Sequence, residues 1–151
     1  MKINLENKYL VLTTNKEEKI LKLKEIIGEN KTILYFYPKD NTPGCSLENK
    51  AFSDLKKEFE NKGYKLVGIS KDSIESHKKF KEKYALKNDL ISDPELILHN
   101  ELGVYGEKNN YGKIVKGVIR SSFIIDKDGN ILKEYRNVKA TGHAEKVFRE
   151  N

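Results

Sequence analysis

Short runs of apolar, β-branched and aromatic residues recur along the chain and predict β-strands. Three of them are typical of strands buried on both faces of a sheet. These three runs are residues 32–37, 65–70 and 121–126. An Asp128-Gly129 turn follows the third run and leads into residues 130–135, which predicts a hairpin. A weaker hairpin is expected near the N-terminus, with strands at residues 9–12 and 19–23.

Apolar residues spaced at helical intervals separate these strands. After the first run they form one face of a single long helix. The residues of this face are Leu47, Ala51, Phe52, Leu55 and Phe59. A second helix is expected over residues 73–84. Asp93 and Pro94 are typical of the capping and first positions of a third helix, which should end before Gly103, and residues 143–150 predict a terminal helix.

The alternation of strands and helices, closed by a hairpin, predicts the fold class. We expect an α/β fold with a central mixed β-sheet flanked by helices. The sequence contains no repeat, low-complexity tract or linker, so residues 1–151 are expected to form a single domain. Many functions share such folds, and the site residues therefore have to identify the activity.

Charge and composition exclude several classes of function. The net charge of +6 would suit nucleic acid, but the lysines are interleaved with acidic residues, as in residues 54–58, which is typical of solvated helix faces. We therefore expect no nucleic-acid partner. No apolar run is long enough to span a membrane, and the N-terminus lacks an apolar signal segment, so we expect a cytoplasmic protein with no membrane partner.

The only cysteine, Cys45, lies in a polar segment between the first buried run and the long helix. Thr42 and Pro43 are typical of a helix start, which places Cys45 at the third helical position. Unpaired backbone N–H groups and the helix dipole at that position favour a thiolate. The alternative is that Cys45 is a small buried hydrophobic residue, as many lone cysteines are, and the residues alone leave both interpretations open.

Pro38, Thr42 and Cys45 form the pattern P-x-x-x-T-x-x-C, which resembles the active-site motif of the peroxiredoxins, thiol peroxidases with a thioredoxin-like fold. The surrounding Tyr-Phe-Tyr-Pro-Lys-Asp-Asn-Thr-Pro-Gly-Cys is similar to the Q-type, or bacterioferritin-comigratory-protein, branch. Four later segments also fit that branch, and together the resemblance covers about residues 31–147. These segments are residues 67–73, 90–93, 103–113 and 119–126.

The resemblance implies a thiol-dependent peroxidase that reduces hydrogen peroxide and organic hydroperoxides in antioxidant defence. Cys45 would be the nucleophile that becomes a sulfenic acid. Arg120 would hold the thiolate and the peroxide. Only three of the 29 basic residues are arginines, which argues against a mere solubilising role for Arg120. Glu48 would orient Arg120, although a charge on an exposed helix face explains Glu48 equally well.

The remaining roles also come from the resemblance. The Thr42 hydroxyl would bind the incoming peroxide, and Pro38 would shield the sulfur from water. The backbone N–H groups of Gly44 and Cys45 would stabilise charge on the leaving oxygen. The resemblance implies no metal and no cofactor, and the sequence contains no nucleotide-binding glycine motif.

Two features depart from the Q-type pattern. Many members carry a resolving cysteine five residues after the first, where this chain has Lys50, so no internal disulfide can form. An external thiol such as thioredoxin or glutathione, or Cys45 of a second molecule, would then reduce the sulfenic acid, and we expect a monomer or a weak homodimer. The N-terminal Asp-x-Ala-Pro-x-Phe segment of the family is also missing.

Two other functions compete with a peroxidase. Cys45 could serve a non-catalytic redox sensor or a thioredoxin-like binding module. A Cys–His hydrolase would need a histidine beside the sulfur. We expect His77, His99 and His143 to be surface or packing residues that do not adjoin the Cys45 loop, and their spacing predicts no metal site.

Overall fold

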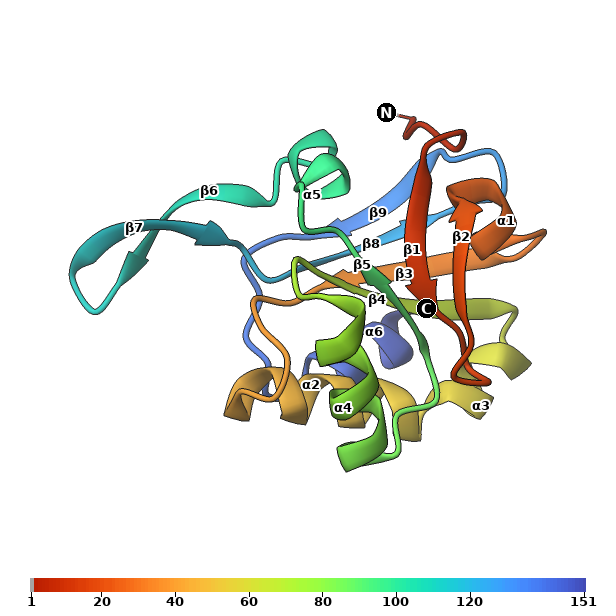
Figure 1. The fold of residues 1–151 in the computed structure, drawn as a ribbon, viewed down its shortest axis with the longest axis horizontal. Coiled ribbons are helices and arrows are strands. Elements are labelled where there is room, and N and C mark those ends of the chain that lie inside the picture. Colours follow the sequence, from red (N-terminus) through yellow and green to blue (C-terminus); the bar gives the residue numbers. More distant parts are fainter. Residues whose placement is uncertain (1) are drawn as a thin grey trace.

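A computed structural model describes residues 2–151. Its main sheet has seven strands in the order β2-β1-β5-β4-β3-β8-β9 (Figure 1). These strands are β1 (Lys8–Leu12), β2 (Glu18–Lys22), β3 (Lys31–Phe36), β4 (Tyr64–Ser70), β5 (Asp89–Ser92), β8 (Ser121–Ile125) and β9 (Ile131–Tyr135). The helices are α1 (Leu23–Ile27), α2 (Pro43–Asp54), α3 (Lys56–Asn61), α4 (Ile74–Tyr84), α5 (Ile97–Glu101) and α6 (His143–Glu150).

The strand directions make the sheet mixed, as the sequence predicts. β3 pairs in parallel with β4, and β4 with β5, whereas β3 and β8 run antiparallel. The predicted N-terminal hairpin is also present, since β1 and β2 pair antiparallel from Lys8↔Lys22 to Leu12↔Glu18. The β3–β8 register places Phe36, the last residue of β3, opposite Ser121. Arg120 therefore lies beside the point where the chain leaves β3.

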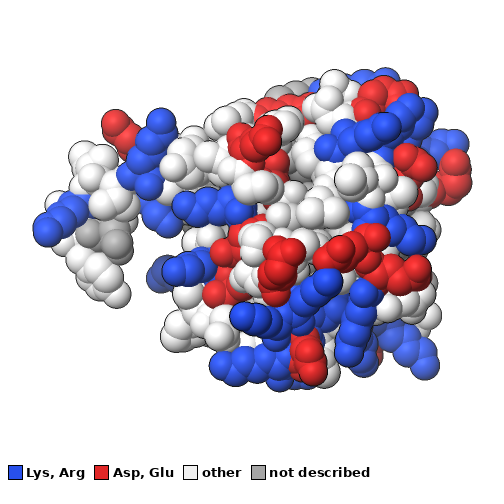
Figure 2. Space-filling view, in the orientation of Figure 1, with Lys and Arg blue, Asp and Glu red and all other residues white. Residues whose placement is uncertain are grey.

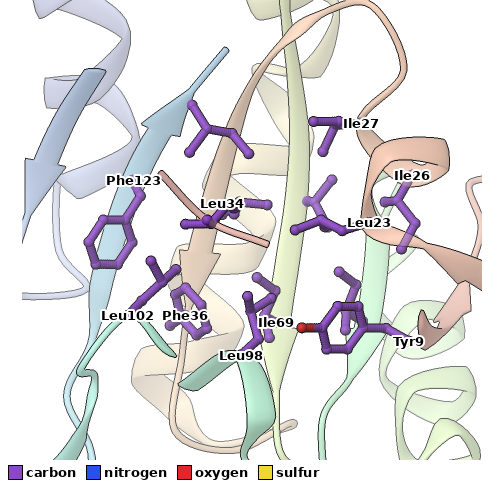
Figure 3. Packing of buried hydrophobic residues seen from close by; sticks show 14 of the residues in the cluster. Tyr9, Leu23, Ile26, Ile27, Leu34, Phe36, Ile69, Leu98, Leu102 and Phe123 are labelled. Atoms are coloured by element: carbon purple, nitrogen blue, oxygen red, sulfur yellow. The ribbon is translucent and has the colours of Figure 1, made fainter. Parts of the chain in front are cut away.

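The two faces of the sheet carry separate cores. Alternate residues of β3 enter them, with Leu34 and Phe36 in one cluster and Ile33 and Tyr35 in the other. In Figure 3 the Leu34 and Phe36 side chains lie in the first cluster, which includes residues of α1 and α5. The second cluster contains Cys45 and lies on the side covered by α2, α4 and α6 (Figure 1).

The predicted helix through residues 47–59 is two helices. α2 ends at Asp54 and α3 begins at Lys56, with Leu55 between them at φ −95° and ψ 4°. The predicted inner face was also partly wrong, because Leu47 is 50% exposed whereas the polar Glu48 is fully buried. The first turn of α2 thus packs against a buried polar site, which apolar periodicity does not detect.

The third predicted helix starts later than expected. α5 begins at Ile97, after Leu96 in a left-handed conformation at φ 61°. Asp93 nevertheless caps this helix, because its carboxylate accepts hydrogen bonds from the N–H groups of Ile97, Leu98 and His99 at 3.0–3.1 Å. The predicted end before Gly103 is confirmed.

A two-stranded hairpin of β6 (Tyr105–Asn110) and β7 (Lys113–Val118) projects from the body and was not predicted (Figure 1). Its polar, glycine-containing sequence lacks the apolar alternation by which strands are recognised. Figure 2 shows basic and acidic side chains interspersed over the visible face. Within residues 2–151, no helix has the length and apolar character that crossing a bilayer requires.

Gly68, in the centre of β4, should not tolerate a side chain. A Cβ there would lie 2.8 Å from the Tyr35 ring, which is held by stacking on Phe52 at 4.4 Å. We expect Gly68→Ala to lower the free energy of unfolding by about 1–3 kcal/mol through overpacking, measured by urea denaturation. Gly106→Ala is the control, because no atom lies within 4 Å of its Cβ position. Equal stability of the two variants would contradict the prediction.

Candidate active site

Cys45 lies in the first turn of α2, at the position the sequence predicts. Thr42 is the capping residue, Pro43 is the first helical residue, and the Ser46 N–H closes the turn on the Thr42 carbonyl at 2.8 Å. The Cys45 side chain is only 1% exposed. The thiol therefore lies beneath the surface, at the carboxyl end of a central strand, where α/β folds place their reactive groups.

Two donors face the sulfur. Arg120 Nη2 lies 3.3 Å from Cys45 Sγ, and the backbone N–H of Lys39 donates to the same atom at 3.5 Å. The guanidinium carries a positive charge into this largely buried site. Both donors point at the atom that would carry the negative charge of a thiolate.

Glu48 holds Arg120 from behind. It lies one turn after Cys45 on α2, is fully buried, and places Oε1 2.5 Å from Arg120 Nη1. Burial raises the pKa of Glu48 to about 7, against the opposing effect of Arg120. Burial also disfavours the Arg120 charge, but Glu48 and Cys45 outweigh it and raise the pKa of Arg120. This burial excludes the alternative of an exposed helix-face charge for Glu48.

Gly44 lies against the guanidinium. A Cβ on Gly44 would stand 3.3 Å from Arg120 Nη2 and 3.6 Å from the Ala140 Cβ. A larger side chain would therefore push Arg120 away from the sulfur. The missing side chain at Gly44 therefore leaves room for the guanidinium that faces Cys45.

Thr42 and Pro38 belong to the segment that leads into α2. The Thr42 hydroxyl donates to the Lys39 carbonyl at 2.9 Å and makes no side-chain cap on the helix. The hydroxyl oxygen still has lone pairs with which to accept a hydrogen bond. Pro38 is partly buried directly before Lys39, whose N–H faces the sulfur.

Asn49 is a site residue that the sequence analysis missed. Its fully buried amide donates to the Cys45 carbonyl at 2.9 Å and accepts from the Tyr35 hydroxyl at 3.0 Å. Asn88 donates in turn to the Tyr35 hydroxyl at 3.2 Å. This chain ties the first turn of α2 to the core. An asparagine four residues after Cys45, on the same helix face, was the available signal.

The expectation that no histidine adjoins the Cys45 loop was wrong for His77. His77 is fully buried on α4, and its Nδ1 lies 2.7 Å from the carboxylate of Asp40, in that loop. His99 pairs with Asp93, and His143 lies 2.8 Å from the Ser122 hydroxyl. Burial, with smaller effects of Lys146 and Arg120, lowers the pKa of His143 to about 4, so its ring is neutral at neutral pH.

The site and the sheet together define a class. A thiol in the first helical turn after a central strand, faced by a half-buried arginine, is typical of a thioredoxin-like thiol enzyme. The sequence model of the AhpC/TSA family matches residues 4–134. A Helicobacter pylori protein assigned to the bcp peroxiredoxins is 48% identical over 128 residues, 85% of this chain and 84% of that protein. Peroxiredoxin Bcp of Bacillus subtilis is 45% identical over 111 residues, 74% of this chain and 71% of that protein.

The solved structures agree. A cysteine-to-serine variant of Xanthomonas campestris peroxiredoxin Q matches with a TM-score of 0.86 and 34% identity, over 97% of this chain and 89% of that one. The chain therefore belongs to the AhpC/TSA family, and within it to the Bcp, or Q-type, peroxiredoxins. These are thiol-dependent peroxidases, so this protein is an oxidoreductase with a thioredoxin-like fold, as the resemblance implied.

The contact between Arg120 and the sulfur can be tested directly. Arg120→Lys keeps a positive charge but loses the planar guanidinium that contacts Cys45 and Glu48 together. We expect the alkylation rate of Cys45 by iodoacetamide at neutral pH to fall about tenfold, the loss expected from one weakened charge-assisted hydrogen bond.

The control is Arg136→Lys, because Arg136 is an exposed residue that pairs with Glu134 at 2.8 Å. It should leave the pH profile of alkylation unchanged. An unchanged profile in Arg120→Lys would mean that the guanidinium does not stabilise the thiolate.

Proposed function

We propose that Cys45 is the peroxidatic nucleophile and that it reduces hydrogen peroxide and organic hydroperoxides. The 3.3 Å contact of Arg120 with Sγ carries this proposal, because it provides a fixed cation where a thiolate must form. The thiolate attacks one peroxide oxygen and the O–O bond breaks. The sulfur becomes a sulfenic acid, and the other oxygen takes up a proton and leaves as water or alcohol.

The neighbouring groups have complementary roles in this proposal. Arg120 holds both the thiolate and the peroxide, and Glu48 fixes the guanidinium. The Thr42 hydroxyl, which donates its hydrogen to the Lys39 carbonyl, accepts a hydrogen bond from the peroxide. The N–H groups of Gly44 and Cys45, at the start of α2, stabilise charge on the leaving oxygen. Pro38 limits access of water to the sulfur.

The sulfenic acid is reduced by an external thiol, because Cys45 is the only cysteine in the sequence. One thiol of thioredoxin or glutathione displaces water to form a mixed disulfide, and a second thiol releases Cys45. The reductant must reach a sulfur that is 1% exposed, so the first turn of α2 has to open during this step. We infer a single-domain cytoplasmic enzyme in antioxidant defence, working as a monomer or a weak homodimer.

The competing interpretation of Cys45 as the thiol of a non-catalytic redox sensor or thioredoxin-like binding module is disfavoured by the family, whose members are thiol-dependent peroxidases. Turnover tests this directly. An enzyme consumes many equivalents of peroxide when thioredoxin or glutathione systems are supplied in turn, whereas a non-catalytic sensor stops after one.

The nucleophile is tested by Cys45→Ser. A serine hydroxyl is not ionised near neutral pH, so we expect peroxide consumption to fall to background while the circular dichroism spectrum is kept. Thr141→Ser is the control. Thr141 is an exposed residue shortly before α6, and this variant should retain activity. Appreciable turnover by Cys45→Ser would show that Cys45 is not the nucleophile.

The absence of a resolving cysteine predicts the products of oxidation. One equivalent of peroxide without thiol should give a sulfenic acid on Cys45 that dimedone traps as a single adduct, and excess peroxide should give the sulfinic and sulfonic acids. Lys50→Cys puts a second thiol on the exposed side of α2. We expect it to form an internal disulfide by opening the first turns of the helix, and to resist overoxidation.

Intact mass spectrometry after a peroxide pulse measures both outcomes. Lys57→Cys is the control, because this exposed position lies on α3, beyond the helix break at Leu55, and should leave the sulfenic acid free to react with dimedone. Loss of two hydrogens from the wild-type monomer would contradict the one-cysteine scheme.

A further inference from the structure

The carboxyl group of Asp40 makes three side-chain contacts inside the segment that precedes α2. Tyr37 donates its hydroxyl at 2.7 Å, Ser76 donates at 2.8 Å, and His77 Nδ1 lies at 2.7 Å. Asp40 is 6% exposed and His77 is fully buried. Tyr37 and Ser76 donate to different oxygens of this group, so both carboxyl oxygens accept hydrogen bonds.

The second nitrogen of His77 defines its protonation. Nε2 lies 2.9 Å from the carbonyl oxygen of Ile91 on β5. A carbonyl and a carboxylate only accept hydrogen bonds, so each ring nitrogen needs its own proton. A neutral ring carries one proton and would direct a lone pair at one of the two oxygens. Both contacts are satisfied when His77 is an imidazolium that forms a buried ion pair with Asp40.

This ion pair is one residue away from a group that contacts the sulfur. Lys39 donates its N–H to Cys45 Sγ, and its carbonyl accepts from the Thr42 hydroxyl. Asp40 follows Lys39 directly, and its own N–H donates to the Asp72 carboxylate at 2.8 Å. The Asp40 side chain thus anchors the segment to α4, and the Asp40 backbone N–H anchors it to Asp72, which follows β4.

We propose that His77 is a positioning residue for the peroxidase reaction, that it acts through its contact with Asp40, and that its ring is an imidazolium in the wild-type protein. It fixes the segment so that the Lys39 N–H faces Cys45 and the Thr42 hydroxyl stays at the site. This role rests on the proposed function of Cys45. His77 itself touches neither the sulfur nor the peroxide.

The groups that face the pair are a phenol, a second carboxyl group, a hydroxyl and a backbone carbonyl. Burial, followed by the charge of Asp40, raises the pKa of Tyr37 well above its ordinary value, so the phenol remains a donor. Asp72 directs its carboxylate at the Asp40 N–H and the Ser70 hydroxyl, at 2.8 and 2.7 Å. On α4 the adjacent contact is the neutral Ser76, and on β5 it is the Ile91 carbonyl.

The first test measures the ring of His77 in the intact protein. Nitrogen-15 NMR of histidine-labelled protein distinguishes an imidazolium from either neutral tautomer, and the His77 signal is assigned by its loss in His77→Gln. We expect both ring nitrogens of His77 to be protonated at neutral pH. A neutral ring would overturn the proposal, whatever the activity of the protein.

The second test compares rates of sulfenic acid formation, measured by quenched mass spectrometry. His77→Gln and Asp40→Ala should slow peroxide attack by about 10- to 100-fold, as expected when a reactive site is misaligned. Asp40→Asn should recover most of the rate. Its amide can donate to a neutral His77 ring and to Ser76 while its carbonyl accepts from Tyr37. Equal losses in Asp40→Asn and Asp40→Ala would contradict positioning through these bonds.

His99→Gln is the matched control for stability. His99 forms the same buried contact, from Nδ1 to Asp93 Oδ2 at 2.7 Å, but Asp93 lies after β5 and outside the Cys45 segment. We expect a loss of thermal stability similar to that of His77→Gln, with an unchanged rate of attack. An equally slow His99→Gln would mean that general destabilisation explains both variants. If the wild-type protein forms no sulfenic acid, the proposed function of Cys45 is wrong. The NMR measurement of His77 protonation does not depend on that outcome.

Discussion

A carboxylate as deeply buried as Glu48 needs a cation beside it, and Arg120 reaches the Cys45 sulfur while bonded to Glu48. Removing one partner of such a pair leaves an uncompensated charge and typically costs about 3–5 kcal/mol. The pair also links two distant parts of the chain, because Glu48 belongs to α2 and Arg120 precedes β8. The β3–β8 register makes the pair possible, since Phe36 opposite Ser121 places Arg120 where the chain turns toward α2.

Two further polar networks hold the thiol from other sides. Asn49 links the Cys45 carbonyl to Tyr35 in the core. Asp40 links the segment that precedes α2 to His77 on α4. Buried polar groups that are fully paired rigidify their surroundings and favour one arrangement. The first turn of α2 is therefore held in place before any peroxide arrives, which is the kind of preorganisation that accelerates a reaction by positioning.

The same rigidity opposes the second half of a thiol peroxidase cycle, in which a thiol reduces the sulfenic acid. Peroxide is small enough to approach a recessed thiolate, but a protein or tripeptide thiol has to contact the sulfur itself. A resolving cysteine on the same helix, as in the Q-type pattern, would meet this need inside one chain. Here Lys50 occupies that position, and reduction depends on an outside thiol meeting a side chain that is 1% exposed in the closed site. In the mechanism proposed for Cys45, the networks around Asn49 and Asp40 would therefore influence reduction as well as attack.

Six of the seven strands of the main sheet, the position of Cys45 in the first helical turn and the family to which the chain belongs follow from the sequence alone. These features depend on local periodicity, on capping residues such as Thr42 and Pro43, and on motifs that keep their order. Only the tertiary structure decided that Glu48 is buried rather than exposed, that the long helix breaks at Leu55, and that His77 reaches the Cys45 loop. Each of these outcomes depends on contacts between residues far apart in the chain. The local sequence around a buried polar residue does not differ from that around a solvated one, because its partner comes from another part of the chain.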